Sequence, residues 1–315
     1  MQVEKLKTID ADTLLSTPMR KTLFVVNGLI PQGLSVLSGS SKIGKSWLML
    51  WLGIQVARGQ PVWEFETHKS DVLYLCFEDT YARIQSRLYQ ITDEAPPELR
   101  IATTSFQIGT GLEQQIEQYL SDFPKTKLVI IDTFQKVRDS KSTGGKNGMY
   151  AGDYDDVSAL KNISDKYGIA VAVVHHVRKL KDVSDPFNEV SGSTGITGAA
   201  DTNFVLKRSR ANETGTLLAT GRDVAYQELT LKFDNRSHLW ELVERKDMED
   251  IHREEIPKFI FRLVDYISEV KEWRGTATQL ITQMNETEVT PNVVTKMLAR
   301  FSSEVFQPQG IEYKT

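Results

Sequence analysis

A segment near the start of the chain has the composition and spacing of a phosphate-binding loop. It reads Gly39-x-x-x-x-Gly44-Lys45-Ser46 and lies between an expected strand and an expected helix. Glycines let the backbone wrap closely around phosphate oxygens, and the first N–H groups of the helix point at them. Lys45 would neutralise the β- and γ-phosphates, and Ser46 would offer its hydroxyl to Mg²⁺. The pattern therefore predicts that ATP and Mg²⁺ bind through Gly39, Ser40, Ser41, Lys42, Ile43, Gly44, Lys45, Ser46 and Trp47.

Two apolar runs further along the chain end in carboxylates that such a site needs. Residues 128–131 lead into Asp132, which would hold the magnesium ion through water. Residues 73–77 lead into Glu78, our candidate for the base that orients or deprotonates the attacking water. Asp79 is expected to cap the following helix, and the alternative is that both acids only cap it.

A fourth apolar run is followed by a pair of histidines, His175 and His176. A neutral imidazole at the end of a strand can donate or accept a hydrogen bond and so sense the γ-phosphate. Zinc binding is an alternative, but no cysteine or third histidine lies nearby in the sequence to complete a zinc site. The remaining alternative is that both are ordinary histidines at the edge of a loop.

Basic residues follow two later strand-like runs: Lys207, Arg208 and Arg222. A cation in such a place can reach the γ-phosphate bound by a neighbouring subunit, as an arginine finger does. The alternative is a solvated surface residue, or a structural pair of Arg222 with Asp223. If one of these cations is a finger, the chain must assemble head to tail.

The elements that must position these residues read as an α/β domain. The main strand-like runs are apolar on both faces and are separated by helices expected over residues 46–58, 81–92 and 154–167. This alternation is typical of a mostly parallel sheet with helices on both faces. Shorter runs between residues 203 and 233 indicate an antiparallel extension at one edge. We expect this domain to span residues 1–245, with residues 1–20 as an N-terminal arm.

Composition excludes several other classes of protein. The chain has 315 residues, a net charge of −4 and one cysteine, Cys76, in a buried apolar run. One cysteine cannot form an intramolecular disulfide framework, and the acidic balance gives no global field for nucleic acid. The longest apolar stretch, residues 47–57, is too short to span a bilayer, and no signal peptide opens the chain. We therefore expect a cytoplasmic protein that does not bind membranes.

The C-terminal part differs in composition. Charged residues 246–255 are expected to be a linker, and residues 256–315 a small helical domain. Thr290-Pro291 is a helix start, and the spacing of the last two helices resembles a helix-turn-helix. Lys296 and Arg300 would then face duplex DNA. The alternative is a module for ring assembly or partner docking.

Taken together, these segments resemble the RepA-like ATPases of plasmids, phages and integrated elements. Those proteins belong to the RecA superfamily and are related to hexameric replicative helicases. The matching segments are, in order, residues 31–47, 72–87, 131–134, 174–179, 191–202 and 221–224. The resemblance implies a RecA-like fold, a winged-helix-like C-terminal domain, and the roles given above for Lys45, Ser46, Glu78 and Asp132, with His175 as the γ-phosphate sensor and Arg222 as the finger.

The resemblance also implies where nucleic acid would bind. Loops at residues 138–153 and 186–198 would face the central channel of a ring. Their lysines and those nearby are candidate contacts to the phosphates of single-stranded DNA. These lysines are Lys141, Lys146, Lys179 and Lys181.

The function that these expectations favour is an ATP-driven hexameric motor on single-stranded DNA. It would be a replicative helicase, or a helicase-like replication protein, of a mobile genetic element, with a replication initiator or a primase as possible partners. The alternative is a nucleotide-gated DNA-binding ATPase that does not unwind DNA, which the acidic balance favours slightly. A regulatory protein without hydrolysis is disfavoured because Lys45, Glu78 and Asp132 are all present.

Overall fold

A computed structural model describes residues 6–18, 22–138, 148–176, 187, 194–209 and 212–313. The chain divides into two units, Met1–Asp247 and Met248–Thr315. Within the described ranges, no helix is both long enough and apolar enough to cross a membrane.

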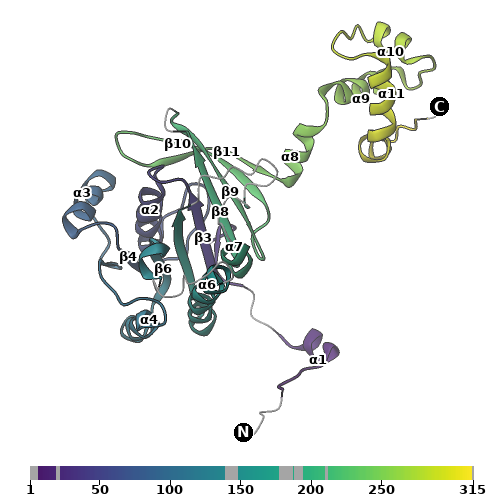
Figure 1. Cartoon of the computed structure of the whole chain (residues 1–315). Coiled ribbons are helices and arrows are strands. Elements are labelled where there is room, and N and C mark those ends of the chain that lie inside the picture. The colour runs from purple at the N-terminus through teal and green to yellow at the C-terminus, as the bar shows by residue number, and fades with distance from the viewer. Residues whose placement is uncertain are drawn as a thin grey trace. The chain divides into compact units, whose positions relative to one another are not determined.

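The first unit is built on a nine-stranded sheet with the strand order β11-β10-β9-β8-β3-β7-β6-β4-β5 (Figure 1). Its strands are β3 (Gly33–Gly39), β4 (Asp71–Cys76), β5 (Leu99–Ala102), β6 (Thr126–Asp132), β7 (Ala170–His176), β8 (Thr202–Arg208), β9 (Thr214–Gly221), β10 (Gln227–Phe233) and β11 (Trp240–Asp247). A separate hairpin precedes it, formed by β1 (Phe24–Val26) and β2 (Ile30–Pro31).

The type of strand pairing changes once across this sheet. The strands from β8 through β3, β7, β6 and β4 to β5 pair in parallel, whereas β8, β9, β10 and β11 pair antiparallel. The mostly parallel sheet with an antiparallel extension at one edge is therefore confirmed. The carboxyl ends of the parallel strands all lie on one edge of the sheet, which is the edge where α/β folds bind ligands.

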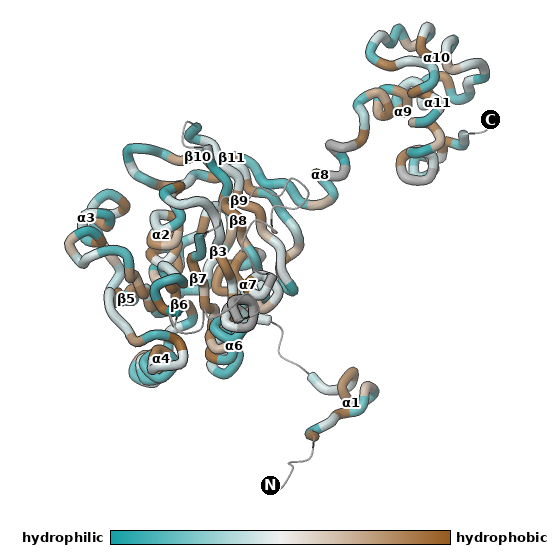
Figure 2. The backbone as a smooth tube through the Cα atoms, in the orientation of Figure 1, coloured by the Kyte–Doolittle hydropathy of each residue, from teal (hydrophilic) through white to brown (hydrophobic). Residues whose placement is uncertain are grey.

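Helices cover both faces of the sheet. They are α2 (Lys45–Arg58), α3 (Tyr81–Ile91), α4 (Leu112–Asp122), α5 (Phe134–Val137), α6 (Gly148–Tyr167) and α7 (Thr194–Ala199), while α1 (Ala11–Ser16) lies in the N-terminal arm and buries no residue. Apolar residues of α2 and α3 form one buried cluster with the sheet, and those of α4 to α7 form another on the opposite face. The hydropathy of the chain follows this layering, with hydrophobic residues concentrated on the central strands (Figure 2).

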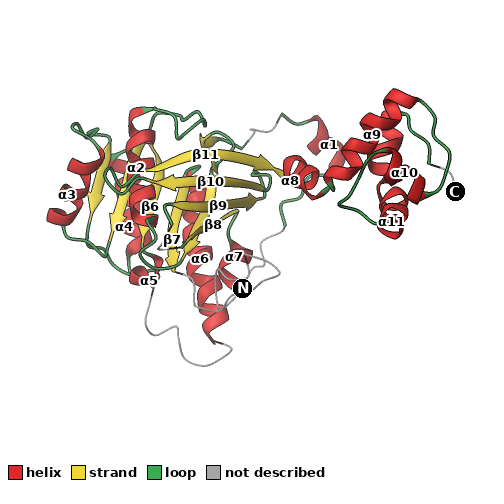
Figure 3. Ribbon diagram, turned by 90° about the horizontal axis from the view of Figure 1, so that it is seen from above, coloured by secondary structure: helices red, strands yellow, loops and turns green. Residues whose placement is uncertain are grey.

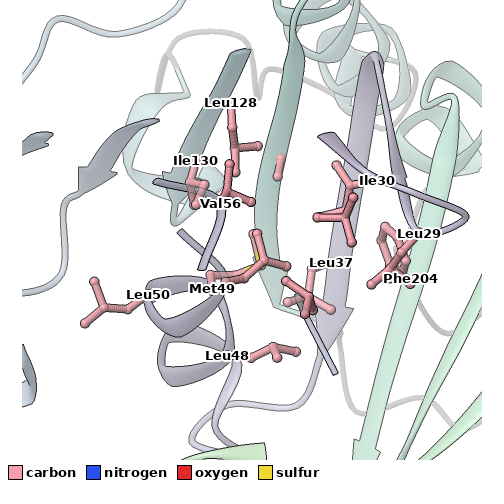
Figure 4. Packing of buried hydrophobic residues seen from close by; sticks show 14 of the residues in the cluster. Leu29, Ile30, Leu37, Leu48, Met49, Leu50, Val56, Leu128, Ile130 and Phe204 are labelled. Atoms are coloured by element: carbon pink, nitrogen blue, oxygen red, sulfur yellow. The ribbon is translucent and has the colours of Figure 1, made fainter. Parts of the chain in front are cut away.

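Helix α2 illustrates how the core holds the phosphate-binding loop in place. Leu48 and Met49 are 3% and 4% exposed and pack toward Leu37 of β3 (Figure 4). Burying one such side chain contributes about 1.5–3 kcal/mol. The helix ends at Gly59, whose φ of 70° lets its N–H bond back to the carbonyl oxygens of Gln55 and Val56, as expected of a C-cap.

A buried carboxylate ties the start of β3 to its neighbours. Asp201 accepts hydrogen bonds from the Leu34 N–H at 2.9 Å and from the Lys161 ammonium of α6 at 2.7 Å. Gly33 precedes this contact with a φ of +115°, and a Cβ there would lie 2.7 Å from Asp201 Oδ2. The sequence therefore needs glycine at position 33 for both its backbone conformation and its space.

Several elements of the first unit differ from the expectation drawn from the sequence. Helix α7 lies in the expected loop 186–198. Strand β5 was not expected because its four residues are only half-buried, and helix α4 was missed although its buried residues Leu112, Ile116 and Leu120 recur at helical spacing. Helix α6 begins at Gly148, so the last third of the expected loop 138–153 is helical. Its glycines disfavour a helix locally, and continuation from the strongly packed part of α6 outweighs that preference.

The second unit is helical (Figure 3). It consists of α8 (Met248–Glu255), α9 (Lys258–Val270), α10 (Ala277–Gln283), α11 (Pro291–Phe301), a π-helical turn (Ser302–Phe306) and a 3₁₀ turn (Gln307–Gln309). Residues of α9, α10, α11 and the π-helical turn form its core, among them Ile260, Leu280, Val294 and Phe306. The segment expected as a linker, residues 246–255, instead ends β11 and forms α8.

The wing of a winged helix is not found, because the described residues 248–313 contain no strand. Thr290 is the N-cap of α11 with proline in the first turn, as expected, but its side chain makes no capping hydrogen bond. Helix α10 has the stronger start, a capping box between Thr276 and Gln279. The helix-turn-helix remains a prediction.

The contact between Gly33 and Asp201 predicts a large difference between two glycine substitutions. Gly33→Ala should lower the free energy of unfolding by about 1–3 kcal/mol, because it combines a strained φ with a clash against a buried carboxylate. The matched control is Gly198→Ala, since a Cβ at this exposed helical position meets nothing within 4 Å. Urea denaturation of both variants checks this, and equal stability of the two would contradict the proposed constraint.

Candidate nucleotide-binding site

The phosphate-binding loop joins the carboxyl end of β3 to the first residue of α2. A Cβ on Gly39 would lie 2.6 Å from the carbonyl oxygen of Leu206, and a Cβ on Gly44 would lie 2.9 Å from the indole nitrogen of Trp240. Gly44 also has a left-handed φ of 103°. No side chain caps the first turn of α2, so its N–H groups remain open to an anion.

Lys45 is buried at the centre of this loop. Its ammonium donates to the carbonyl oxygens of Gly39 at 2.7 Å and Ser40 at 2.8 Å. Burial lowers the pKa of Lys45 to about 8, although the negative charges of Asp132 and Glu78 act in the opposite direction. The ammonium of Lys45 is therefore stabilised by carbonyl dipoles, and its lowered pKa lies closer to neutral pH than that of an ordinary lysine. A phosphate bound beside it would stabilise the charged form.

Asp132 ends β6 beside the loop and is 3% exposed. Its Oδ2 accepts a hydrogen bond from the hydroxyl of Tyr74 on the next strand at 2.8 Å, and the Ser46 side chain also bonds to this carboxylate. Burial raises the pKa of Asp132, and the bonds from Ser46 and Tyr74 lower it. The Ser46 hydroxyl at the start of α2 and the Asp132 carboxylate at the end of β6 are hard oxygen donors of the kind that Mg²⁺ prefers, so the residues present fit this ion.

His176 links the loop to the predicted base. Its Nδ1 lies 3.1 Å from Lys45 Nζ, and its Nε2 lies 3.7 Å from Glu78 Oε1. An ammonium can only donate, so Nδ1 accepts and the imidazole proton is on Nε2, which faces Glu78. Glu78 follows β4 with a half-exposed side chain, as a residue that meets water requires.

His175 lies on the opposite face of β7. It is 9% exposed, and its ring packs edge-on against Phe134 with 6.0 Å between centroids. Successive side chains of a strand point to opposite faces, so only one of two adjacent histidines can face the loop. The structure brings His176, and not the expected His175, into contact with Lys45 and Glu78.

A family model described as an AAA domain matches residues 2–182, which is more than half of the chain. The chain belongs to this AAA domain family. The family match and the fold confirm the resemblance to RecA-superfamily P-loop ATPases. Curated proteins include no match to the sequence.

Two solved structures share the fold of this AAA domain. One, described as an ATPase domain, has a TM-score of 0.55 and 13% identity and covers 68% of this chain and 85% of its own. The other is described as a DnaB-like replicative helicase and its interactions with primase, with the same TM-score, identity and share of this chain. The chain spans 58% of the length of that helicase.

Residues at the antiparallel edge of the sheet contact the phosphate-binding loop and the start of α2. Trp240 of β11 donates its indole N–H to the carbonyl oxygen of Gly44 at 3.2 Å, and His238 stacks on Trp47 with ring centroids 4.3 Å apart. The guanidinium of Arg87, on α3, also lies over the ring of Trp47, 5.2 Å from its centroid. Trp240 and His238 had no motif to mark them, because they come from a distant part of the sequence, whereas Trp47 and Arg87 lie in segments of the resemblance.

Two further residues near the site have contacts that the sequence analysis did not predict. Tyr74 is a hydroxyl in an otherwise apolar strand, and a buried hydroxyl requires a hydrogen-bond partner. Asp79 does not cap α3, since Thr80 is the N-cap. Instead its carboxylate pairs with Arg87 at 2.6 Å and Arg83 at 3.2 Å, which anchors α3 beside the loop.

The candidate fingers lie at two different edges of the sheet. Arg222 follows the antiparallel strand β9, so it lies beside the start of β8 and away from the loop of its own chain. Its guanidinium is 3.4 Å from Asp201 Oδ1 and its side chain is 64% exposed. Lys207 and Arg208 end β8 on the edge that carries the loop, where Arg208 lies 4.2 Å from the ring centroid of Phe233.

The predicted DNA contacts are only partly within the described residues. Lys141, Lys146, Lys179 and Lys181 lie outside them. Lys296 and Arg300 are exposed on α11 of the second unit, four residues apart and therefore on one side of the helix. A role for these lysines and this arginine in DNA binding stays a prediction.

The lowered pKa of Lys45 predicts that nucleotide binding weakens in mildly alkaline solution. The protonated form binds phosphate, so the dissociation constant for ATP should rise by up to about tenfold per pH unit once the pH exceeds that pKa. Titration with a fluorescent ATP analogue at several pH values between about 7 and 9, without Mg²⁺, measures this. Lys45→Met should bind more weakly and show no such slope, and a flat wild-type profile would contradict the assignment.

The positions of the two histidines predict opposite phenotypes. His176→Ala should slow ATP hydrolysis by about tenfold or more, because it removes the group between Lys45 and Glu78. His175→Ala should instead lower the free energy of unfolding by about 1–3 kcal/mol, because it leaves a cavity against Phe134. Turnover measurements and denaturation curves on both variants separate the two effects, and the reverse pattern would restore His175 as the sensor.

Proposed function

We propose that this chain is a magnesium-dependent ATPase that assembles into a hexameric ring and acts as a motor on single-stranded DNA, as a replicative helicase or helicase-like replication protein of a mobile genetic element. The observation that supports it most is the meeting of Lys45, Ser46, Glu78, Asp132 and His176 at one edge of a RecA-like sheet.

The residues divide the chemistry of hydrolysis among them. Lys45 and the open N–H groups of α2 would bind the phosphates, and Ser46 and Asp132 would hold Mg²⁺. When bound, this ion would neutralise charge on the phosphate oxygens. Glu78 orients a water molecule for in-line attack and accepts its proton. His176 contacts both Lys45 and Glu78, so it can report the presence of the γ-phosphate to the base.

Assembly is proposed from the place of Arg222. This exposed cation lies at the edge of the sheet opposite its own phosphate-binding loop. A head-to-tail neighbour would bring such an edge to the loop of the next subunit, where an arginine completes the charge stabilisation. Lys207 and Arg208 are the other candidates, although the packing of Arg208 against Phe233 argues for a structural role.

Nucleic acid and protein partners are proposed from the fold. The fold is that of a protein described as a DnaB-like replicative helicase and its interactions with primase. We therefore propose single-stranded DNA as the track, and a replication initiator or a primase as a protein partner. In the second unit, Lys296 and Arg300 on α11 would contact duplex DNA.

The second candidate function is a nucleotide-gated DNA-binding ATPase that does not separate strands. The net charge of −4 favours it, because a motor that grips DNA usually concentrates basic residues. Binding to a forked duplex that depends on ATP but never releases a strand would support this alternative.

ATP hydrolysis with and without a single-stranded oligonucleotide tests the proposal. The wild-type chain should hydrolyse ATP faster with DNA, and native mass measurement should show a ring when an ATP analogue and the oligonucleotide are present. Glu78→Gln should bind ATP with unchanged affinity but lose turnover by about 100-fold or more, since the base is gone. A monomer with unstimulated turnover would refute the motor, and normal turnover of Glu78→Gln would remove Glu78 from its role.

A further inference from the structure

Tyr74 is a buried tyrosine that faces the predicted metal site. It belongs to β4, the strand that leads to Glu78, and is 1% exposed. Its hydroxyl donates to Asp132 Oδ2 at 2.8 Å, across the boundary between β4 and β6. The rest of the ring packs into the apolar cluster between the sheet and α2. The side chain therefore spans the distance from the core to the carboxylate.

The hydrogen bond of Tyr74 constrains how Asp132 can turn. A carboxylate at the end of a strand can rotate about its last bond, and a donor held by a rigid, packed ring limits that rotation. Ser46 also bonds to this carboxylate, from the first turn of α2. Asp132 is thus held between a donor from the core and a donor from the loop.

The contribution of Tyr74 to this contact is its hydroxyl group. A phenylalanine would fill the same space in the core but would leave one oxygen of a buried carboxylate without this partner.

We propose that Tyr74 is a positioning residue for the magnesium ion: its hydroxyl orients Asp132 so that the carboxylate, together with Ser46, presents oxygen ligands to the metal. This inference rests on the proposed ATPase function. Outer partners of this kind fix the geometry of a metal ligand, and their loss typically weakens metal affinity by about 10- to 100-fold. Tyr74 itself touches neither the nucleotide nor the reacting atoms.

The test compares nucleotide affinity with and without Mg²⁺ in three proteins. These are the wild-type chain, Tyr74→Phe and Tyr119→Phe. Tyr119→Phe is the matched control, because it removes a buried hydroxyl from α4, a helix that packs on the other face of the sheet. Titration of a fluorescent, slowly hydrolysed ATP analogue gives one dissociation constant without Mg²⁺ and one with it. The ratio of these two constants measures how much Mg²⁺ tightens binding.

We expect Tyr74→Phe to bind the analogue normally without Mg²⁺ and to lose about tenfold of the tightening that Mg²⁺ gives. The concentration of Mg²⁺ at half-saturation should rise by a similar factor, while Tyr119→Phe should match the wild type. Because the ratio compares each variant with itself, partial unfolding raises both dissociation constants by the same factor and leaves the ratio unchanged. Loss of stability therefore cannot imitate the result.

Two other outcomes would be decisive. If Tyr74→Phe weakens binding equally with and without Mg²⁺, or not at all, Tyr74 is only a core residue and the inference is overturned. If the wild-type chain shows no tightening by Mg²⁺, the proposed magnesium-dependent ATPase is itself wrong. The failure of the inference and the failure of the function are thus distinguished by the wild-type measurement alone.

Discussion

The parallel pairing of β3, β7, β6 and β4 is the constraint on which the site depends. In the register of this sheet, Gly39 lies beside His176, and Asp132 lies beside Cys76, two residues before Glu78. Parallel strands end on one edge of a sheet, so residues that are far apart in the sequence are brought together without any loop having to reach for them. A shift of one residue in any of these strands would turn its polar side chain to the opposite face.

A second constraint follows from bringing charges to a buried edge. Lys45 loses its water and is held by carbonyl oxygens and His176. Asp132 is held by the hydroxyl groups of Tyr74 and Ser46. Each charge is therefore partly satisfied by neutral groups, which keeps both from closing into an ion pair. The arrangement leaves Lys45 available to phosphate and Asp132 available to a metal ion.

How far the sequence could be interpreted depended on how local each signal was. The phosphate-binding loop, the strands that end at Asp132 and Glu78, and the helix that ends at Gly59 were all predicted, because a strand or helix of typical period and its terminal residues are contiguous in the chain. Strand β5 was missed because its burial is partial, whereas helix α4 carries a regular apolar spacing, Leu112, Ile116 and Leu120, that went unrecognised. The winged-helix-like domain was implied by resemblance to other proteins and not by a strand pattern, and it stays a prediction.

The sequence by itself determined the chemistry of this protein: which glycines, lysine, serine and carboxylates can bind a nucleotide with magnesium, and that alternating buried strands and helices must carry them. The tertiary structure decided which of two adjacent histidines faces Lys45, that Tyr74 supports Asp132, and that Trp240 closes over Gly44. The physical reason is that residue type and spacing set what a side chain can do, whereas its partners depend on which face of a strand it occupies and which strands pair. That pairing is a property of the whole sheet.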